Sequence, residues 1–509
     1  AGWITAAYLA KILSHDLPGG LDIVLVEAPE IGVIGVGEGT FPSIRKTFAR
    51  IGLDEETLIR EASATYKQGI RFVNWKGVTD ERGQDAYFHP FQISAQHTDF
   101  DLLPYWLLGV AGDVSWESVC TVQQRVADAG KAPKLINQPG HNGALTYAYH
   151  FDAVQLTGVL RKKAISLGVR HIEDKVEQVV VGDNGFIERL VTRAHGDLQA
   201  DLYIDCTGFN AQLIGKALGE PFKSCRSQIF ANRAVALQAP YEQPGQAIAS
   251  QTISTAQEAG WTWDIGLTER RGVGYVYSTD HSTDERAEQV LMDYVGRSGR
   301  ACDVRFLNFE AGCRHAQWKN NCVAIGLSAG FIEPLEATGI GFAEIAALIL
   351  SNLFPWEGDY QVCADQFNRF MTRRFYHVVD FIKMHYCLTR RTDTDFWRDN
   401  VRPETIPDGL KARLERWRYR PPSFLDMDPN HDIFTDASWQ YVLYGMGYKT
   451  DIGTQAGVYR YFNEAKSQFA EIRRQAERAL SILPSHRDLI EQVRVQGFQQ
   501  NAPLAKRIA

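Results

Sequence analysis

The chain has 509 residues, 45% hydrophobic and 11% aromatic, and carries a formal net charge of −7. A chain of this length can bury a large core and form two or three domains. Its acidic balance gives no general attraction to nucleic acid or to an anionic membrane surface. Its apolar runs, such as 345–350, are far shorter than the roughly 20 residues of a membrane-spanning helix. Nucleic-acid and membrane partners are therefore not expected.

The chain starts with a helical pattern at 1–13, and after a loop at 14–20 an apolar run at 21–27 predicts a buried parallel strand. In a dinucleotide-binding βαβ unit, a glycine loop places the pyrophosphate at a helix N-terminus, and an acid about 20 residues later binds a ribose hydroxyl. Gly2 could be the last glycine of that loop and Glu27 the acid, with the first strand and glycines upstream of residue 1. An ordinary α/β packing unit explains this fragment equally well.

Three glycine-rich junctions further along favour the nucleotide interpretation. Segment 30–44 holds four glycines within ten residues, an apolar strand at 200–209 runs into Thr207 and Gly208, and 321–350 predicts a strand, a glycine-rich loop and a long helix. Glycines let the backbone approach a ligand, and a loop before a helix directs free N–H groups at an anion. Junctions this far apart suit a two-part nucleotide such as FAD, bound to an α/β fold.

Other segments give a coarser prediction. Segment 168–192 predicts strands paired through an Asn-Gly turn. The C-terminal part predicts helices at 358–400, 403–420 and 459–480, with a proline-broken loop at 391–409. The eight cysteines are scattered, and none belongs to a CxxC pair or a Cys/His cluster. No metal site is expected, and free thiols in a cytoplasmic protein are the favoured interpretation.

The segment GWTWDIGL, at 260–267, places Trp261 and Trp263 on one side of an extended strand. Such pairs most often belong to a core. Here, however, the segment resembles the GWxWxI(P) signature of flavin-dependent halogenases, the tryptophan halogenase family. Other segments match that family in the same order: TYKQGIRFVNW (65–75), YFHPF (87–91), YAYHFDA (147–153), DCTGF (205–209) and FIEPLEATGI (331–340).

This resemblance implies a flavoprotein-monooxygenase-like α/β fold, with a Rossmann-type βαβ unit and mixed sheets. Residues 1–355 would form the FAD-binding and halide-activating body, and 356–509 a mostly helical part covering the substrate. A separate flavin reductase would supply FADH₂, if only by diffusion. A flavin hydroperoxide would then oxidise chloride or bromide to hypohalous acid, which reaches a lysine beside an electron-rich aromatic ring. A homodimer stays open.

The resemblance assigns catalysis to Lys67 and Glu336 and halide binding to the backbone of Thr338 and Gly339. By residue type alone, a solvated lysine and a helix-capping carboxylate are the ordinary alternatives. A lysine in an apolar pocket can instead donate to hypohalous acid or form a haloamine, and the sequence does not choose between these. Glu333 is expected to be structural.

The resemblance also assigns cofactor, shielding and substrate roles. Trp261 and Trp263 would keep the organic substrate from the flavin. The substrate would meet His89, Phe91, Trp439 and Tyr444, although a core role explains each of these as well. Ten residues are assigned to FAD: Gly2, Glu27, Gly35, Gly37, Glu38, Thr40, Val176, Gly208, Gly326 and Ile340.

Two residues depart from the family pattern. Gly266 stands where the signature usually has proline, and Ala337 stands where tryptophan-specific members have serine after the glutamate. The expected substrate is an indole, a substituted indole or a phenol-like ring, with tryptophan itself as a poor substrate. Two alternatives share the FAD fold: an aromatic hydroxylase, against which Lys67, Glu336 and the tryptophan pair argue, and a non-catalytic relative, which would lack the charged pair.

Overall fold

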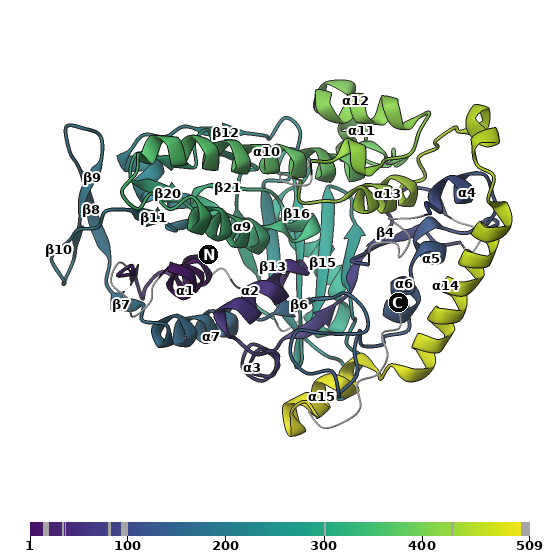
Figure 1. The fold of residues 1–509 in the computed structure, drawn as a ribbon, viewed down its shortest axis with the longest axis horizontal. Coiled ribbons are helices and arrows are strands. Elements are labelled where there is room, and N and C mark those ends of the chain that lie inside the picture. Colours follow the sequence, from purple (N-terminus) through teal and green to yellow (C-terminus); the bar gives the residue numbers. More distant parts are fainter. Residues whose placement is uncertain are drawn as a thin grey trace.

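The computed structural model describes most of the chain, and its α/β fold confirms the predicted class. The described residues are 1–13, 20–32, 35, 37–79, 83–92, 100–299, 302–428 and 432–499. Figure 1 shows strands at the centre, the long helix α10 (Tyr360–Cys387) along one side above α9 (Thr338–Asn352), and α14 (Phe462–Ile482) along another edge. None of the described helices is long and apolar enough to cross a bilayer.

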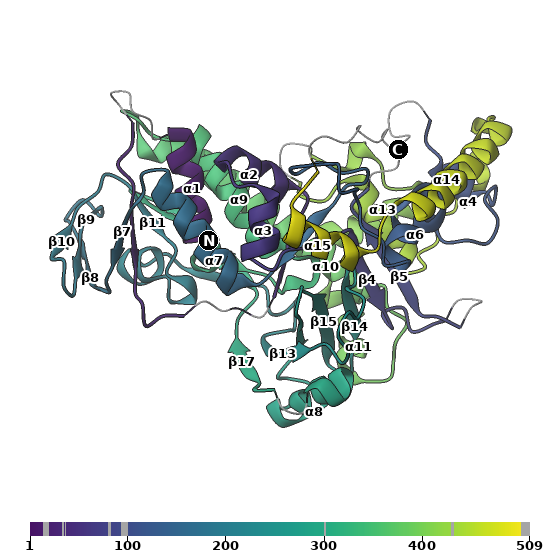
Figure 2. The same ribbon diagram turned by 90° about the horizontal axis from the view of Figure 1, so that it is seen from below.

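The central sheet joins segments that are far apart in the sequence. Its strand order is β17-β13-β16-β15-β14-β4-β5, and β14 pairs in parallel with β4 while its other ladders are antiparallel. Helix α8 (Asp284–Val295) packs against β13 and β16 at one end of the molecule (Figure 2). The strands are β4 (Gly69–Val73), β5 (Ala86–Pro90), β13 (Arg233–Pro240), β14 (Thr252–Ala256), β15 (Gly260–Gly266), β16 (Arg270–Tyr277) and β17 (Arg305–Asn308).

Smaller sheets surround the N-terminal helix α1 (Gly2–Leu13), which packs against α7 (Ala153–Ser166) and α9. The pairs β1–β7 and β11–β20 are parallel, as in a nucleotide-binding unit. The sheets are β1 (Val24–Glu27) with β7 (Arg170–Glu173); β10 (Asp197–Leu198), β9 (Ile187–Thr192) and β8 (Val176–Val181); β11 (Tyr203–Asp205), β20 (Cys322–Ala324) and β19 (Trp318–Lys319); β12 (Phe222–Ser224), β18 (Gly312–Arg314) and β21 (Gly330–Phe331); and β2 (Glu38–Gly39), β6 (Ala148–Phe151) and β3 (Thr65–Lys67).

Two extended hydrophobic cores hold these layers together. One lies around α1, α7 and α9, and the other between the central sheet and the C-terminal helices. The remaining helices are α2 (Ser43–Ile51), α3 (Glu55–Glu61), α4 (Leu103–Leu107), α5 (Trp116–Cys120), α6 (Gln123–Asp128), α11 (Asp395–Asn400), α12 (Asp408–Trp417), α13 (Asp436–Gly445) and α15 (His486–Gln496).

Several predicted elements are confirmed. The first helix is α1, and β1 is the expected parallel strand ending at Glu27. The expected burial of this strand was wrong, because β1 begins only at Val24 and its residues are exposed or half-buried. The strands at 168–192 include the β8–β9 hairpin, closed by a hydrogen bond from the Gly182 amide to the Phe186 carbonyl. The two tryptophans lie on β15, and the helix predicted at 459–480 is α14. Most of the loop predicted at 14–20, and residues 33, 34 and 36 of the glycine-rich segment, lie outside the described residues.

Two predictions about boundaries were wrong. The loop predicted at 391–409 contains α11, and the helix predicted from 403 begins only at Asp408. The prolines start structure here rather than break it: Pro403 opens a 3₁₀ turn and Pro407 precedes the first residue of α12.

The chain changes sheets directly after Lys67. Lys67 ends β3, and β4 begins at Gly69 in a different sheet. Between them the Gln68 amide donates to the Ser250 carbonyl, 2.7 Å away. This change of sheet places Lys67 at a junction between two layers.

Candidate active site

Lys67 is buried at the end of β3, and its amine is unpaired. The side chain has no exposed surface, and no described group accepts a hydrogen bond from Nζ. The nitrogen lies 5.3 Å from the ring centroid of Phe91, an arrangement in which the ring face attracts the cation. Burial lowers the pKa of Lys67 to about 8, against the opposing influence of Glu336. The amine can therefore exist in both protonation states near neutral pH.

Glu336 ends a short 3₁₀ turn, Pro334–Glu336, and is fully buried. Nδ1 of His89 lies 3.0 Å from both carboxylate oxygens, and Nε2 of His385 lies 3.1 Å from Oε1. On the other side of its ring, His385 Nδ1 lies 2.6 Å from the Tyr87 hydroxyl. Burial alone would raise the pKa of Glu336, but the two imidazoles lower it to about 2. Glu336 is thus held as a carboxylate.

A glycine brings the two charged residues together. A methyl group on Gly39, in β2, would lie 3.1 Å from Lys67 Nζ and 3.4 Å from Ala337 Cβ. Ala337 directly follows Glu336 and has φ of 56°, in the left-handed region that costs a β-carbon steric strain. Only a residue without a side chain leaves space between the lysine and this turn.

The turn continues into α9, where the predicted halide residues lie. Thr338 is its first residue, and the buried Thr338 hydroxyl has no described hydrogen-bond partner. A side chain at Gly339 would meet no atom within 4 Å. The first amides of a helix have no intrahelical acceptor, and the helix dipole favours an anion there. Open space beside free N–H groups is compatible with the predicted halide position.

Aromatic rings surround His89 and Phe91. Phe91 lies 6.4 Å from Phe41, and Phe41 lies 5.6 Å from Phe434. Phe434 in turn stacks on Phe381 at 3.8 Å, and His89 lies 5.8 Å from Phe381. The contacts join α10 to the segment before α13, and they form an apolar surround suited to a flat ring.

The other two predicted substrate residues lie within the helical packing. Trp439 is fully buried and contacts Phe381 edge-on at 4.9 Å. Phe381 in turn is the ring that contacts His89, so Trp439 is separated from His89 by this ring. Tyr444 contacts Trp106 at 5.2 Å and shares a hydrogen bond with Thr450. Neither contact set excludes a substrate role, which stays a prediction for both residues.

The tryptophan pair lies on the central sheet, as its alternation predicts. The rings of Trp261 and Trp263 lie 6.3 Å apart, and both indole N–H groups are buried without a hydrogen-bond partner. Trp263 faces Gly274 on β16, where any side chain would collide with its ring. A side chain on Gly37 would lie 3.4 Å from Gly272 on that same strand, so the glycine-rich loop borders the strand pair that carries the tryptophans.

The predicted cofactor junctions converge on the N-terminus of α1. A methyl group on Gly2 would lie 3.6 Å from Cys206, two residues before Gly208, and one on Gly326 would lie 2.6 Å from Ala1. Gly208 and Gly326 both have positive φ, and a side chain at Gly208 would meet nothing within 4 Å. Three separate segments therefore meet at the N-terminus of α1, an arrangement compatible with binding of the FAD phosphates there.

The other cofactor predictions lie around this region. Glu27 is already engaged, with its carboxylate 3.0 Å from Arg161 and 3.4 Å from His171. Burial raises the pKa of Glu38 to about 7. Thr40 is fixed by hydrogen bonds to the backbone of Tyr149. Gly35 borders Val154, Val176 begins β8, and Ile340 packs in the core around α1.

Sequence reasoning missed the partners that α10 supplies. His385 and Phe381 lie on this 28-residue helix, for which the sequence predicts only helical structure. Two signals could have found them: His385 is a histidine in an apolar stretch, and it lies one turn after Phe381. Two glycines of β16, Gly274 opposite Trp263 and Gly272 opposite Ile265, are two residues apart, as on one face of a strand, and were also missed.

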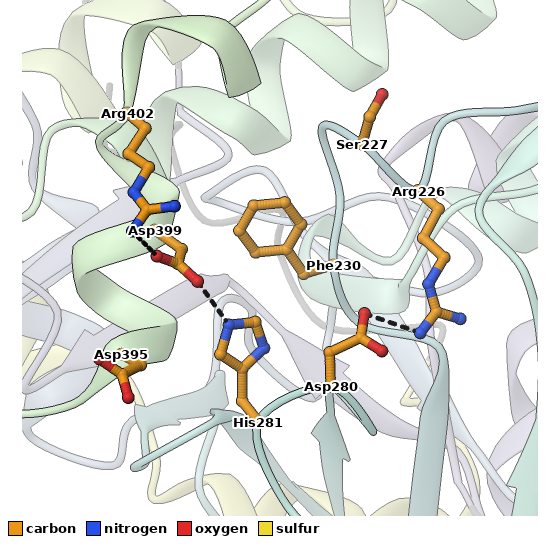
Figure 3. A pocket seen from close by; sticks show the side chains of 8 residues that line it. All are labelled: Arg226, Ser227, Phe230, Asp280, His281, Asp395, Asp399 and Arg402. Carbon is orange, nitrogen blue, oxygen red and sulfur yellow. Dashed lines mark hydrogen bonds and ion pairs between the residues drawn. The ribbon is translucent and has the colours of Figure 1, made fainter.

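An open pocket of about 660 Å³ lies elsewhere, and Figure 3 shows its lining. Arg226 pairs with Asp280 at 2.9 Å, and Asp399 pairs with both Arg402 and His281. Because most of its charged side chains already pair with one another, this pocket offers a ligand little unsatisfied charge. The buried Lys67–Glu336 region is the stronger candidate for catalysis.

Comparison with known proteins identifies the family of the chain. The sequence matches the tryptophan halogenase family over residues 1–457. It is 35% identical over 509 residues to the tryptophan 6-halogenase SttH of Streptomyces toxytricini, with 95% of each chain covered. A tryptophan halogenase structure from Shewanella frigidimarina is similar with a TM-score of 0.93 and 38% identity, covering 98% of this chain and 96% of that chain. BrvH, a flavin-dependent halogenase from Brevundimonas sp. BAL3, has a TM-score of 0.85 and 32% identity, with 96% of each chain covered.

Proposed function

This chain belongs to the tryptophan halogenase family and is a flavin-dependent halogenase, and on that premise we propose that it installs chlorine or bromine on an electron-rich aromatic ring. The proposed substrate class is an indole, a substituted indole or tryptophan, and tryptophan is the substrate that the names of several relatives specify. The observation that carries the proposal is Lys67, a buried amine with no hydrogen-bond partner among the described residues, placed against Phe91 and beside the Glu336 turn.

In this proposal, bound FADH₂ would reduce O₂ by two electrons to the peroxide level, and this oxygen would oxidise halide to hypohalous acid with release of water. Lys67 then receives the oxidised halogen beside the aromatic substrate. With its pKa near 8, the amine can donate a hydrogen bond as an ammonium or bind halogen as a neutral haloamine, and both chemistries stay open.

Glu336 faces the positive charge that develops on the ring when halogen adds. A carboxylate whose pKa is lowered to about 2 is a weak base, so it acts mainly by electrostatic stabilisation of that cation. His89 and His385 hold the carboxylate in place. When the ring regains aromaticity, its proton leaves to Glu336 and passes on to solvent.

Trp261 and Trp263 act by bulk in the proposed scheme. Their rings lie on the strand pair bordered by the loop that contains Gly37, one of the proposed cofactor residues. A small halide can approach the flavin, while an indole is excluded. Steric exclusion would separate halogenation from ring hydroxylation without an acid or base.

The wider assignments also belong to this proposal. A separate reductase supplies FADH₂, by diffusion or by contact, in a cytoplasmic setting, and a homodimer is one assembly to test. The FAD contacts are those predicted above, and the region bordered by Gly2, Gly208 and Gly326 is where the phosphates would lie.

The test is a product assay with FAD, a flavin reductase, NADH, O₂, bromide or chloride, and a panel of indoles that includes tryptophan. Mass spectrometry separates a halogen isotope pattern from a single added oxygen, which is the product of the hydroxylase alternative. We expect halogenated product from the wild type and from Lys162→Met, an exposed-lysine control, but not from Lys67→Met. Product at the wild-type rate in Lys67→Met contradicts the proposal.

A further inference from the structure

Glu333 is a buried carboxyl for which the proposed mechanism has no use. It has no exposed surface, and its Oε1 accepts a hydrogen bond of 2.5 Å from the hydroxyl of Tyr386 on α10. Its Oε2 has no described hydrogen-bond partner. An unsatisfied buried carboxyl oxygen costs free energy, so its presence calls for a physical reason.

The carboxyl group and its tyrosine partner both lie near Trp261, one of the two tryptophans on β15 that form the proposed wall between flavin and substrate. The indole N–H of Trp261 is close enough to the Glu333 carboxyl and to the Tyr386 hydroxyl to lower the pKa of each, although it does not reach full hydrogen-bond geometry. Trp261 itself is 1% exposed. Glu333 and Tyr386 are therefore polar neighbours of the buried indole N–H of Trp261.

Helix α10 clamps both ends of the same turn. His385 contacts Glu336, and the next residue, Tyr386, contacts Glu333, so consecutive side chains of one helix hold the two glutamates of Glu333–Glu336. Tyr386 is packed against Trp75 at 5.2 Å, which limits its movement. A displacement of Glu333 is thus expected to shift both Trp261 and the turn that carries Glu336.

We propose that Glu333 and Tyr386 are a positioning pair that fixes the indole of Trp261, so that the wall keeps the aromatic substrate away from the flavin. This inference rests on the proposed function. It assigns Glu333 a role beyond the structural one expected from the sequence, and it treats neither residue as a participant in the chemistry.

The charged groups around Glu333 are few. Tyr386 and Lys383 face it from α10, Trp261 faces it from β15, and Tyr275 faces Tyr386 from β16. Lys383 donates 2.9 Å to Asn400 and lies 4.9 Å over the ring of Phe230. Burial raises the pKa of Glu333 to about 7, against opposing influences from Tyr386, Trp261 and Lys383. Near neutral pH the carboxyl is often protonated, and glutamine mimics that form.

Glu344 supplies a matched control. It is also buried, its pKa is likewise raised to about 7 by burial, and it accepts a 2.6 Å hydrogen bond from the Thr47 hydroxyl rather than facing the tryptophans. Glu333→Leu and Glu344→Leu therefore remove the same kind of group from two different surroundings. Glu333→Gln and Tyr386→Phe complete the set.

The first readout needs no flavin and no turnover. The indole ¹⁵N–¹H signal of Trp261, assigned with Trp261→Phe, is followed by NMR between pH 6 and 8 in uniformly folded samples. We expect the wild-type signal to shift with a midpoint near pH 7, the shift to vanish in Glu333→Leu, and Glu344→Leu to keep it. A Trp261 signal that titrates unchanged in Glu333→Leu overturns the inference.

The second readout is the ratio of oxygenated to halogenated product. Glu333→Leu and Tyr386→Phe are expected to raise it at least about fivefold, and Glu333→Gln and Glu344→Leu by less than about twofold. An equal rise in Glu344→Leu would mean general loosening and overturns the inference. If the wild type yields no halogenated product, the proposed function fails, while the NMR result still decides whether Glu333 holds Trp261.

Discussion

Lys67 and Lys134 are both fully buried, yet their surroundings differ in kind. The amine of Lys134 donates to the carboxylate of Glu55 at 2.5 Å, to the Gly140 carbonyl at 2.7 Å and to the Tyr147 hydroxyl at 3.3 Å. The amine of Lys67 donates to no described group and faces the Phe91 ring.

The difference separates a structural charge from a functional one. A buried ammonium whose hydrogen bonds are satisfied holds its neighbours together, and removing it leaves a buried carboxylate unpaired. A buried ammonium without partners destabilises the fold and is tolerated where function needs its reactivity. Lys134 is therefore assigned to stability and Lys67 to chemistry. The comparison would fail if replacing Lys134 abolished turnover while replacing Lys67 lowered only stability.

The largest expected effect is on turnover in Lys67→Met. Halogenated product should fall at least about 100-fold, since the residue that receives the oxidised halogen is lost. The measurement is product formed per folded enzyme, with flavin oxidation followed in parallel. Continued flavin oxidation without product supports a role after halide oxidation, and product at the wild-type rate refutes the role.

Lys134→Met should do the opposite. It leaves Glu55 buried opposite two tyrosine hydroxyls without its cation, and the free energy of unfolding should fall by about 3–5 kcal/mol. Denaturant titration measures this change. The halogenation rate per folded enzyme should stay within about twofold of the wild type. A larger loss of this rate would mean that Lys134 also contributes to the chemistry, against the comparison.

Gly39→Ala sharpens the comparison at the position beside Lys67. Its methyl group would lie 3.1 Å from Nζ, and the displaced amine should lower halogenation about tenfold while stability changes little. Gly32→Ala is the control, because a side chain there meets no atom within 4 Å. Equal activity in the two variants would show that the space beside Nζ is not needed.

The smallest expected effect concerns the turn after Glu336. Ala337 has φ of 56°, so Ala337→Gly should remove steric strain and raise the free energy of unfolding by about 1 kcal/mol. Ala346→Gly, inside α9, should lower it by a similar amount, because glycine in a helix interior is destabilising. Thermal unfolding shows whether the free energy of unfolding rises or falls in each variant. A loss of stability in both variants would contradict the proposed backbone strain at Ala337.

The sequence predicted the parts of this molecule that depend on local pattern. The acid-tipped strand ending at Glu27, the hairpin of β8 and β9, and the shared face of Trp261 and Trp263 each follow from periodicity or turn chemistry. The order of the family motifs brought Lys67 and Glu336 into one hypothesis.

The rest depends on contacts that form only in the folded chain. His385 reaches Glu336 because α10 packs against α9 and brings His385 beside Tyr87, although the histidine lies 49 positions after the glutamate in the sequence. The end of β3 at Lys67 depends on pairing with β6 and on the Ser250 carbonyl, neither of which has a local signal. The prolines near 403 were misread because proline favours helix starts as well as breaks.

The most direct test of the comparison is the difference in unfolding free energy between the wild type and Lys67→Met from pH 7 to pH 10. Burial lowers the pKa of Lys67 from 10.5 to about 8, so the unfolded chain binds the extra proton between these values and wild-type stability rises with pH there. We predict that the variant is the more stable at pH 7 and that this advantage shrinks by about 2–3 kcal/mol by pH 10. A difference that stays constant across this range would show that Lys67 is not a buried, unpaired ammonium, and the account would fail.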